Sequence, residues 1–498
     1  MPVPAPDQPS QRQRRAAAAL LATLSPAANE LGDVFAAAGH ELALVGGSVR
    51  DAFLRRPLHG DLDLTTDATP ERVVELVTGW ADQVWTVGAR FGTIGLRRGQ
   101  QIFEITTYRS ERYDSSSRKP AVEYGTSLVA DLARRDFTVN AMAARLPGHE
   151  LVDPFGGLTD LQRRALVTPG SPQASFTDDP LRILRAARFT AQLGFTVTPP
   201  VRAAMTELAG LLAPPKVSAE RIAAELSKLM LSTLPGGPSA GIALLVETGI
   251  ADQVLPEVPM LRLESDEHYR HKDVYQHSLR VLDRAIDLEP RYGLEPDLVL
   301  RLAALLHDIG KPRTRSRLPD GRVAFHHHEV VGAKMAAKRL ADLRYSKEIV
   351  DDVSRLIELH LRFHGYGEGE WTDSAVRRYV TDAGPLLTRL HALTRADCTT
   401  RNKAKALRLE RSYDDLEQRI AELGAQEELA KIRPDLNGTQ IMELLGLTPG
   451  PLVGQAYRHL LDLRMEHGPL GQERAVQELL AWAASVGIAA PPTPGPAE

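Results

Sequence analysis

The chain has 498 residues, of which 43% are hydrophobic and 25% are charged, with a formal net charge of −4. This length exceeds what one compact core usually holds, so we expect two to four domains in a soluble globular protein. The near-neutral balance excludes a surface that is basic throughout and leaves room only for a local basic groove. The single cysteine, Cys398, excludes an intrachain disulfide and a cysteine-based zinc site. It fits a reducing, cytoplasmic setting, and no apolar run approaches the ~20 residues of a membrane helix.

Hydrophobic patterning divides the chain into a mixed α/β part and a long helical part, so the predicted fold class is α+β. Strand-like runs broken by glycine occupy residues 41–45, 62–65, 93–96 and 102–107. From about residue 175 onward, Ala/Leu/Arg-rich amphipathic segments predict helices almost exclusively. The expected segments are 1–28 (a disordered tail and the start of an Ala-rich helix), 29–170 (head), 171–265 (helical neck), 266–400 (histidine-rich helical domain) and 401–498 (helical tail with a disordered end).

The first motif joins a buried strand to a helix through two glycines. It runs from Leu42 to Asp51 as LALVGGSVRD, with Gly46 and Gly47 at the turn. Adjacent glycines let backbone N–H groups approach a phosphate, the following helix N-terminus favours negative charge, and Arg50 adds a fork of donors. A Gly-Gly turn alone is usually structural, so the prediction of a phosphate site depends on the acidic pair that follows.

Two aspartates lie on the next strand-like run, HGDLDL. Because side chains alternate along a strand, Asp61 and Asp63 share one face, while Leu62 and Leu64 point to the core. Neighbouring carboxylates repel each other unless a cation lies between them, and such a pair suits Mg²⁺ with a nucleotide's phosphates. An isolated Asp-x-Asp is more often a solvent-facing pair on an edge strand. The Gly-Gly turn upstream favours the catalytic metal site.

A third acidic residue, Glu104, is expected on a neighbouring strand. Residues 91–96 and 102–109 predict a hairpin, and apolar residues flank Glu104 at the centre of its strand. An unpaired charge is costly there, so Glu104 is a candidate catalytic or supporting carboxylate of the metal site. A salt bridge to Arg109 or to another arginine is the alternative.

Four motifs, in order and at similar spacing, resemble those of the bacterial-type CCA-adding tRNA nucleotidyltransferases and poly(A) polymerases, which share a polymerase-β-like head. They are GGSVRD (46–51), DLD (61–63), RRDFTVNAMA (134–143) and DPFGG (153–157). The resemblance covers roughly residues 30–235. It implies an α/β head followed by an all-α body, Mg²⁺ held by Asp61 and Asp63, and a mobile loop at 110–120. The nucleotide contacts that it implies are Gly46, Gly47, Arg50, Arg135, Asp136 and Asn140.

Residues 175–189, SFTDDPLRILRAARF, predict a helix with Thr177 or Asp178 as its cap. Asp179 and Arg182 lie three residues apart and therefore project from one face. A carboxylate accepts a hydrogen bond from an exocyclic amine, and a guanidinium donates to a ring nitrogen or carbonyl oxygen. Cytosine and adenine present an amine beside an acceptor, whereas uracil and guanine present the reverse order. The pair can therefore select C and A without a template strand, and the alternative is an ordinary salt bridge.

The same segment is similar to the nucleobase-selecting helix of the family, and this similarity favours the selecting role. Arg185 and Arg188 continue a basic stripe that suits contacts with a triphosphate or a base. The family usually has Glu-Asp where this chain has Asp178-Asp179. The shorter Asp178 puts in doubt an orienting contact that the Glu makes, but it leaves the selecting pair intact.

Histidines crowd between residues 268 and 364, where the pattern resembles the HD-domain metal phosphohydrolases. Their signature is a His, a His-Asp pair and a distant Asp. The candidate ligands here are His277, His307, Asp308 and Asp397, with His328 and His360 for a second metal. Such a ligand mixture suits Mn²⁺, Ni²⁺ or Fe²⁺ better than Ca²⁺. Some CCA-adding enzymes carry such a domain, where it implies phosphodiesterase or phosphatase activity on RNA ends.

Basic residues also gather after residue 400, at Arg401, Lys403, Lys405, Arg408 and Arg411. They are a candidate surface for the RNA backbone. Acidic residues are interleaved among them, so a solvated helix face is an equal alternative.

Together, these features predict a CCA-adding tRNA nucleotidyltransferase, which adds C, C and A to tRNA 3′ ends from CTP and ATP without a nucleic-acid template. Its partners would be tRNA, CTP and ATP, with no membrane, and no protein partner follows from the sequence. One alternative is a poly(A) polymerase. Another is a metal phosphohydrolase whose head only binds RNA or nucleotides. Addition of only C or only A also stays open.

Overall fold

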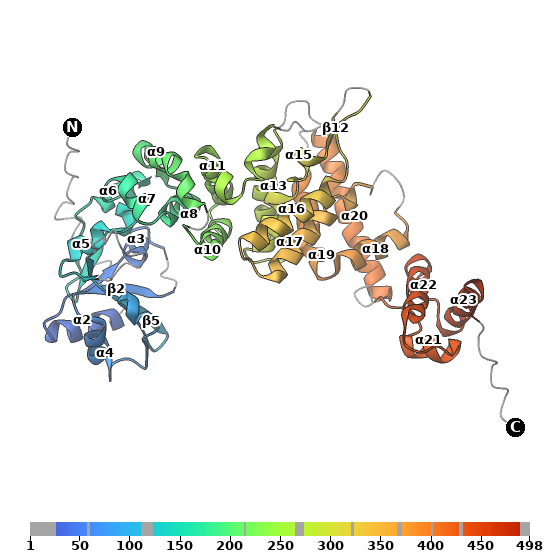
Figure 1. Cartoon of the computed structure of the whole chain (residues 1–498), viewed down its shortest axis with the longest axis horizontal. Coiled ribbons are helices and arrows are strands. Elements are labelled where there is room, and N and C mark those ends of the chain that lie inside the picture. The colour runs from blue at the N-terminus through green and yellow to red at the C-terminus, as the bar shows by residue number, and fades with distance from the viewer. Residues whose placement is uncertain are drawn as a thin grey trace. The chain divides into compact units, whose positions relative to one another are not determined.

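The computed structural model describes residues 26–56, 60–110, 123–213, 216–263, 273–319, 323–365, 371–399, 402–427 and 432–488. Packing divides the chain into two units, Met1–Val254 and Leu255–Glu498. Figure 1 shows the first in blue to green and the second in yellow-green to red. The predicted disordered tail and end, and most of the predicted loop at 110–120, lie outside the described residues.

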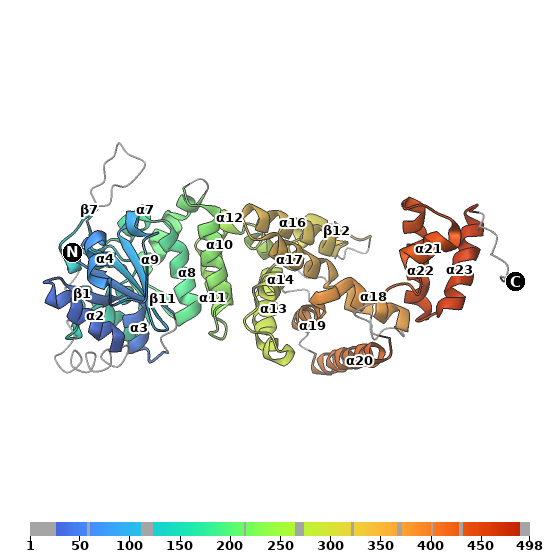
Figure 2. The same ribbon diagram turned by 90° about the horizontal axis from the view of Figure 1, so that it is seen from below.

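A seven-stranded mixed sheet forms the core of the first unit (Figure 2). Its order is β3-β4-β5-β2-β1-β8-β9, and among these strands only β2 and β5 run parallel to each other. The strands are β1 (Leu42–Val45), β2 (Leu62–Thr66), β3 (Gln83–Trp85), β4 (Thr93–Arg98), β5 (Gln101–Thr107), β8 (Ala143–Leu146) and β9 (Glu150–Val152). The predicted strands and the β4–β5 hairpin are therefore confirmed, and the fold class is α+β.

The register of β2 and β5 brings acidic residues together at one face of the sheet. Leu62 and Leu64 are buried, whereas Asp63 between them is exposed, as the period of two predicts. In the parallel pair, Asp63 is the register partner of Glu104. The two carboxylates therefore project from neighbouring strands on the same side.

Short helices surround the sheet of the head. In Figure 1, α2 and α4 lie together against the sheet, and both pack on its strands. The α-helices of the head are α2 (Pro26–Ala37), α3 (Gly47–Phe53), α4 (Pro70–Val77), α5 (Leu128–Ala133) and α6 (Gly157–Arg163). Two 3₁₀ turns, η1 (Ala89–Phe91) and η2 (Thr138–Asn140), and the small strand pairs β6 (Arg109–Ser110) with β7 (Glu123–Tyr124) and β10 (Ala165–Leu166) with β11 (Thr196–Val197) complete it.

The DPFGG motif has a structural role at the start of α6. The Asp153 carboxylate accepts hydrogen bonds from the backbone N–H groups of Gly157 (2.7 Å) and Leu158 (2.9 Å). A Cβ on Gly157 would lie 2.2 Å from the Thr138 carbonyl oxygen, so only glycine fits. This close contact packs α6 onto η2, the turn that ends at Asn140.

Helices form the rest of the first unit. They are α7 (Pro172–Asp178), α8 (Leu181–Leu193), α9 (Pro199–Glu207), η3 (Ala209–Leu212), α10 (Ala219–Met230), α11 (Gly237–Glu247) and α12 (Ala251–Val254). Figure 2 shows α8, α10 and α11 side by side, and α8 packs on both of the others.

The helix predicted over 175–189 is in fact two helices, and the predicted caps are wrong. Thr177 and Asp178 lie in the last turn of α7, and Pro180 occupies the N-cap position of α8. Asp179 between the helices is extended, with φ −137° and ψ 98°. A residue that precedes proline is disfavoured in the helical region, which explains the break.

Helices dominate the second unit. Its first part contains η4 (Pro259–Leu263), α13 (Val274–Leu288), η5 (Pro290–Tyr292), α14 (Leu298–Leu306), α15 (Lys311–Thr314), the hairpin β12 (Arg315–Arg317) and β13 (Val323–Phe325), α16 (His328–Asp342), α17 (Lys347–Leu359), η6 (Arg362–Gly365), α18 (Asp373–Ala383), η7 (Gly384–Leu386) and α19 (Leu387–Asp397). Helices α13, α14, α17 and α19 pack against one another, and α16 packs on α17. Helix α14 ends at Leu306, directly before His307 and Asp308.

The last helices are α20 (Lys403–Glu427), α21 (Gly438–Leu445), α22 (Pro451–His467) and α23 (Gln472–Ser485). The last three, red in Figure 2, share a hydrophobic core that includes Ile441, Leu460 and Leu479. None of the described helices is both long enough and apolar enough to span a bilayer.

Candidate active sites in the two units

A pocket of about 390 Å³ opens in the first unit beside the Gly-Gly turn. Its volume lies in the range of small-molecule sites. It is lined by Gly46, Gly47, Arg50, Asp63, Arg134, Arg135, Asp136, Asn140, Asp179, Arg182, Arg185, Arg188, Phe189 and Gln192. All residues predicted to contact a nucleotide therefore lie together, with Asp63 among them. Asp61 and Glu104 are not part of this lining.

The close packing of neighbouring side chains around residue 46 explains why a glycine occupies this position of the turn. Gly46 has φ +72°, and a Cβ there would lie 3.0 Å from Arg135 Nη1 and 3.9 Å from Asp63 Oδ2. A side chain at this position would be strained and would enter the pocket.

The acidic face of the sheet carries mutual repulsion. Although Asp63 as a whole residue is exposed, neighbouring protein atoms partly desolvate its carboxylate; this desolvation and the charge of Asp61 raise its pKa, against the opposing effect of Arg135 and Arg185. Burial and the charges of Asp63 and Asp61 raise the pKa of Glu104. Within the described part of the chain, Glu104 forms no ion pair, and Arg109 instead donates to Thr93 Oγ1 at 3.3 Å. The described residues therefore do not form the salt bridge between Glu104 and Arg109 that was the alternative interpretation.

These carboxylates have the chemistry of a site for a hard divalent cation, because a cation would relieve the repulsion that raises their pKa values. Among the described head residues, no three such groups converge within 4.8 Å. Mg²⁺ is usually held by one or two carboxylates together with waters and substrate phosphates. An open acidic edge beside a phosphate-sized pocket matches that mode of binding.

A chain of charged hydrogen bonds fixes the basic wall of the pocket. Arg50 donates to both oxygens of Asp51 (2.9 and 2.8 Å) and, through Nη1, to Asn140 Oδ1 at 2.6 Å. Asn140 Nδ2 donates to Asp136 Oδ1 at 3.0 Å, and Arg185 Nε donates to Asp136 Oδ2 at 2.6 Å. Burial would raise the pKa of Asp136, but Arg185 and the bonds from Asn140 hold it below its ordinary value. The motif residues thus orient two guanidinium groups at the pocket.

Three guanidinium groups lie close to the Phe189 ring at this wall. The guanidinium carbons of Arg50, Arg185 and Arg188 lie 5.3, 5.7 and 4.4 Å from the ring centroid. Burial lowers the pKa of Arg188 to about 10, although Glu225 opposes the shift from 3.0 Å away. Three cations this close together suit a polyanionic ligand.

Asp179 and Arg182 both line the pocket, but they do not form the ordinary i,i+3 salt bridge within the described chain. Asp179 Oδ1 accepts from the N–H of Leu181 at 3.2 Å, and both its carboxylate oxygens lie 3.3 Å from Arg221 Nη2. Arg182 Nη1 donates to Ser175 Oγ at 2.8 Å, and its Nη2 donates to the Arg134 carbonyl. Each member of the pair is therefore oriented by its own partners.

The second unit contains a buried cluster of histidines and aspartates. Five helices contribute: His277 lies on α13, His307 and Asp308 follow α14, His328 begins α16, His360 follows α17, and Asp397 ends α19. His277 Nε2 lies 2.8 Å from Asp397 Oδ1 and 3.7 Å from Asp308 Oδ2, and His328 Nε2 lies 3.3 Å from Asp308 Oδ1. The structure therefore brings all six predicted ligands together.

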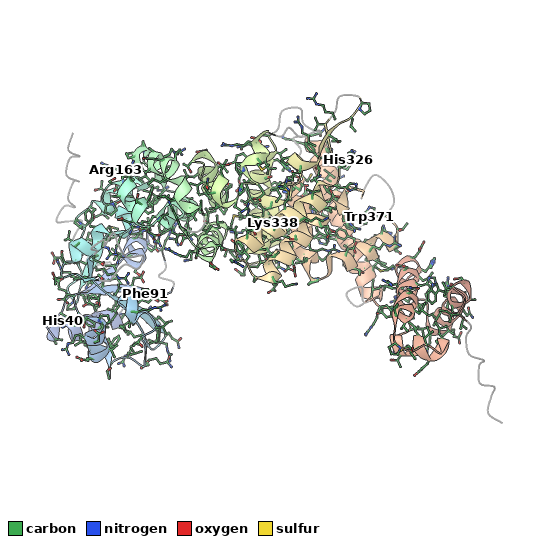
Figure 3. The ribbon with its side chains drawn as sticks, in the orientation of Figure 1. His40, Phe91, Arg163, His326, Lys338 and Trp371 are labelled. Carbon is green, nitrogen blue, oxygen red and sulfur yellow. The ribbon has the colours of Figure 1, made fainter. Side chains whose placement is uncertain are left out.

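The cluster contains two overlapping sets of potential ligands. In the first, the ligand atoms of His277, His307 and Asp308 lie within 4.8 Å of one another, and in the second those of Asp308, His328 and His360 do. Asp308 belongs to both and is 1% exposed. The neighbouring His326, labelled in Figure 3, and His327 are exposed, so of the three consecutive histidines His328 alone enters the cluster.

Backbone carbonyl groups orient three of the imidazoles in the same way. The Nδ1 atoms of His307, His328 and His360 lie 2.9, 2.9 and 2.6 Å from the carbonyl oxygens of Ala304, Phe325 and Ile357. In the neutral imidazole, donation from Nδ1 leaves a lone pair on Nε2. All three Nε2 atoms are buried and none forms a hydrogen bond of good geometry in the described chain, although His307 Nε2 and His328 Nε2 each lie 3.3 Å from an Asp308 carboxylate oxygen. A metal ion satisfies such atoms, so these residues fit the ligand set of an HD domain.

The buried carboxylates of the cluster favour a positively charged partner. Burial would lower the pKa of His307, but the Asp308 and Asp397 carboxylates raise it to about 10. Burial would raise the pKa of Asp308, but His307, Lys311, whose Nζ lies 2.8 Å from Asp308 Oδ2, and His328 hold it well below its ordinary value. Burial and the proximity of His307 lower the pKa of His360 to about 3. A proton and a lysine thus supply positive charge that a divalent ion would also supply.

Family models match three consecutive parts of the chain. They are the Poly A polymerase head domain at residues 42–167, the Probable RNA and SrmB- binding site of polymerase A at 194–261, and the HD domain at 274–402. An A-adding tRNA nucleotidyltransferase of Deinococcus radiodurans is 34% identical over 446 residues, which are 88% of this chain and 94% of that protein. The chain belongs to the bacterial-type tRNA nucleotidyltransferase and poly(A) polymerase family, with an HD domain.

A CCA-adding enzyme of Geobacillus sp. is 40% identical over 232 residues, 46% of this chain and 53% of that relative. In this match the chain spans about half the length of the relative. The crystal structure of the Bacillus stearothermophilus CCA-adding enzyme in complex with CTP superposes with a TM-score of 0.63 at 22% identity, over 93% of this chain and 99% of that one. At this identity, the likeness shows that the nucleotidyltransferase shares the fold.

Several residues of this nucleotidyltransferase's pocket were not predicted as site residues from the sequence. Arg134, Phe189 and Gln192 line it beside the predicted residues. Arg221 and Glu225 of α10 contact two of its lining residues from more than 35 positions away in the chain. The sequence shows a basic stripe and amphipathic helices. Local spacing does not reveal which residues form ion pairs over long distances along the chain.

Proposed function

We propose that this nucleotidyltransferase adds C, C and A to the 3′ end of tRNA from CTP and ATP. One observation carries the proposal: a single pocket gathers an acidic strand residue, a wall of oriented arginines and the Asp179/Arg182 pair. The three parts match the three needs of the reaction, which are metal binding, triphosphate binding and base selection. A cytoplasmic setting, where tRNA and nucleotides occur, goes with this proposal.

The reaction forms a bond between the RNA 3′ oxygen and the α-phosphorus of the nucleotide and breaks the bond from that phosphorus to the departing pyrophosphate. Asp61 and Asp63, with Glu104 beside them, would hold Mg²⁺, which lowers the pKa of the 3′-hydroxyl and neutralises pyrophosphate. Arg50 and Arg185 would bind and orient the triphosphate through their fixed guanidinium groups. No template strand is needed for any of these contacts.

Selection of C and A would come from Asp179 and Arg182. Asp179 accepts a hydrogen bond from the exocyclic amine that both bases present, and Arg182 donates to the acceptor beside it. Uracil and guanine would place a carbonyl against the carboxylate and an N–H against the guanidinium. Each mismatch leaves a charged group without a partner, which costs more than the lost bond alone.

Addition of A alone is the second candidate. The relative that matches over 88% of the chain is an A-adding enzyme, and the pocket residues suit adenine as well as cytosine. Poly(A) synthesis is a third outcome of the same chemistry. The identity of the nucleotides added separates these candidates.

We also propose that the HD cluster holds one or two transition-metal ions, such as Mn²⁺, Ni²⁺ or Fe²⁺, for hydrolysis of phosphate esters on RNA ends. The three buried Nε2 atoms, none of which forms a hydrogen bond of good geometry in the described chain, support metal binding. His277, His307, Asp308 and Asp397 would hold the first ion, and His328 and His360 together with Asp308 would hold a second one. At the start of α20, the exposed Lys403, Lys405, Arg408 and Arg411 are a proposed contact with the tRNA backbone, whereas Arg401 lies outside the described residues.

The test of the main proposal is the length of the products. Purified protein is incubated with Mg²⁺, CTP and ATP, separately and together, and with tRNA transcripts that end at the discriminator base, at C or at CC. Growth by three, two and one nucleotides, absent in Asp61→Ala, supports CCA addition. Extension of only the CC transcript supports A addition, and an open-ended A ladder shows a poly(A) polymerase. No extension by the wild type contradicts the transferase proposal.

A further inference from the structure

The chain between two members of the HD cluster forms a short arm with a basic surface. The arm connects Asp308 to His328 and consists of α15 and the hairpin of β12 and β13, which extends away from the neighbouring helices in Figure 1. No Asp or Glu occurs among its described residues, 309–319 and 323–327. Its cationic side chains in these ranges are Lys311, Arg313, Arg315 and Arg317.

Both ends of the arm are fixed at the cluster. Lys311, at the start of α15, places Nζ 2.8 Å from Asp308 Oδ2 and 5.8 Å from the centre of the Phe325 ring. Phe325 ends β13, and its carbonyl oxygen lies 2.9 Å from His328 Nδ1. Helix α15 packs on both α16 and β13. The arm therefore begins and ends beside the buried ligands, and direct contacts set its position relative to them.

Strand pairing places two of the arginines on the face of the hairpin that carries Phe325. In the antiparallel register, Arg315 is opposite Phe325. Two residues further on, Arg317 is opposite Val323. Opposite residues share one face of a two-stranded sheet, and residues two apart in a strand share it as well. The basic side chains therefore follow one another along a line that starts at the cluster, with a step of about 6.6 Å between the two arginines.

The partners of these cations differ from those of two other exposed cations in the second unit. Lys338 on α16 and Lys347 on α17 are 76% and 89% exposed, and each pairs with an aspartate four residues later, at 2.7 and 2.6 Å. Such pairs are typical of a solvated helix face. Arg313 and Arg317 are also exposed, but neither forms an ion pair within the described part of the chain. The arm therefore lacks the charge balance of an ordinary solvated surface.

The position of the positive charge indicates the class of ligand. A mononucleotide that places its phosphate at the cluster ends there and leaves the outer arginines without a contact. An RNA strand continues beyond its terminal phosphate ester, and each further phosphate adds a negative charge that guanidinium groups along the arm can bind. Contacts with phosphates carry no information about the bases, so this mode of binding is independent of sequence.

We propose that α15 and the β12–β13 hairpin bind the phosphate backbone of an RNA strand whose terminal phosphate ester enters the HD cluster. This inference rests on the proposed hydrolysis by the cluster, and it names an RNA strand, not a free nucleotide, as the substrate class. Hydrolysis adds a water oxygen to the terminal phosphorus, breaks one ester bond and gives a proton to the leaving oxygen. Arg313 and Arg317 bind the strand and take no part in these bonds.

The first experiment compares two substrates that carry the same reactive group. They are hexauridylate that ends in a 2′,3′-cyclic phosphate and uridine 2′,3′-cyclic monophosphate, which lacks the preceding phosphates, each assayed with Mn²⁺ or Ni²⁺. The wild type should have the higher kcat/KM with the hexamer. In the double variant Arg313→Gln/Arg317→Gln, the ratio of hexamer to monomer kcat/KM should fall about tenfold, mainly through KM for the hexamer, because two phosphate contacts are lost.

Binding gives a readout that does not depend on hydrolysis. Fluorescence anisotropy without added metal measures the affinity for labelled hexauridylate at several salt concentrations. Each phosphate contact with a single strand contributes about 0.7 to the slope of log K against log salt, so the slope should be about 1.4 smaller in the double variant. Ultraviolet crosslinking of a 4-thiouridine hexamer, followed by mass spectrometry, should identify peptides from α15, β12 or β13.

The control variant is Lys338→Gln/Lys347→Gln, which removes the same charge from α16 and α17; Lys338 is labelled in Figure 3. It should leave the substrate ratio and the salt slope unchanged. The inference is overturned if the arm variant keeps the wild-type ratio within twofold, if the control variant lowers the ratio equally, or if the wild type prefers the monomer.

A wild type that hydrolyses neither substrate would contradict the proposed hydrolysis, and the binding measurements then decide on the arm. An unchanged salt slope in the arm variant, or crosslinks only to peptides outside the arm, would overturn the inference in that case. If circular dichroism shows that the double variant does not fold, Arg313→Gln and Arg317→Gln are tested singly, each with an expected slope change of about 0.7.

Discussion

In the head, three carboxylates lie along two neighbouring strands with Asp63 exposed, whereas the HD cluster encloses two carboxylates and four imidazoles among five helices. Desolvation and neighbouring acidic residues raise the pKa values of Asp63 and Glu104, and the three acidic residues do not converge within 4.8 Å in the described chain. The cluster ligands converge in two sets, with their tautomers set by backbone carbonyl groups.

The ligands proposed for the two sites account for the difference. A metal that arrives with a triphosphate needs only part of its ligands from the protein, because phosphate oxygens and waters complete the shell. A metal that stays in place needs preformed ligands, and burial keeps competing water away. The open site therefore depends on its substrate for assembly, and the buried one depends on its helices.

The largest expected effect is loss of transfer in Asp63→Asn. The substitution keeps the shape of the side chain but removes a metal-binding charge, so transfer should fall on the order of 10³-fold or more. Radiolabelled nucleotide incorporation into tRNA measures it. Asp82→Asn, on an exposed head loop, is the control and should stay near wild type. A transfer rate within tenfold of wild type would contradict the role of Asp63.

Asp308→Asn should remove metal from the HD cluster while transfer by the head continues. Asp308 belongs to both ligand sets, so its loss affects both ions. We expect metal affinity to fall by about 100-fold or more, since loss of even a supporting contact costs 10- to 100-fold. Metal content after dialysis, measured by mass spectrometry, tests this. Unchanged metal content would show that the cluster does not bind metal through Asp308.

Gly310→Ala should disturb the same cluster through packing alone. A Cβ there would lie 2.1 Å from the His328 carbonyl oxygen and 2.7 Å from the Gly332 nitrogen. Overpacking of this kind costs about 1–3 kcal/mol of unfolding free energy. Chemical denaturation compares it with Gly438→Ala, where an added Cβ meets nothing within 4 Å. Equal stabilities of the two variants would mean that the backbone accommodates the added carbon.

The smallest effect concerns stability and pH in the head. The folded-state pKa values of Asp63 and Glu104 lie above the ordinary 3.8 and 4.5, so the folded state binds more protons. Stability due to these groups is therefore lost as pH rises from about 4 through the folded pKa values. At neutral pH without divalent metal, Asp63→Asn should raise the unfolding free energy by less than about 1 kcal/mol. Mg²⁺ with CTP should stabilise the wild type and not the variant.

Denaturation at pH 7 and pH 5, with and without Mg²⁺ and CTP, measures this effect. A metal-free Asp63→Asn protein that is less stable than the wild type at pH 7 would show that the carboxylate has a favourable partner. The repulsion assigned to the acidic face would then be wrong.

The local features of both sites were predictable from the sequence. The alternation of Asp61, Leu62, Asp63 and Leu64 depends only on the period of a strand, and the structure places Asp63 outward and both leucines inward. The six candidate ligands of the HD cluster were predicted because their order along the chain resembles a family signature. In the structure, all six lie in one cluster.

Features that depend on tertiary packing were not predictable in this way. The break at Asp179 was missed because a strong helix pattern continues across Pro180, although proline disfavours helix in the residue before it. The pairing of Asp179 with Arg221 joins residues 42 apart, and no local period encodes it. Within the residues that the structure describes, Glu104 forms no ion pair, and this likewise depends on the orientation of Arg109, which the sequence does not give.

The central claim is that the head pocket transfers nucleotides and selects C and A through Asp179 and Arg182. The most direct measurement is incorporation of each of the four nucleotides, one at a time, into a tRNA that lacks its terminal CCA, by the wild type and by Asp179→Ala. The account predicts that the wild type uses CTP or ATP and rejects UTP and GTP, and that Asp179→Ala loses most of this discrimination. Equal use of UTP by the wild type, or undiminished discrimination in Asp179→Ala, would contradict it.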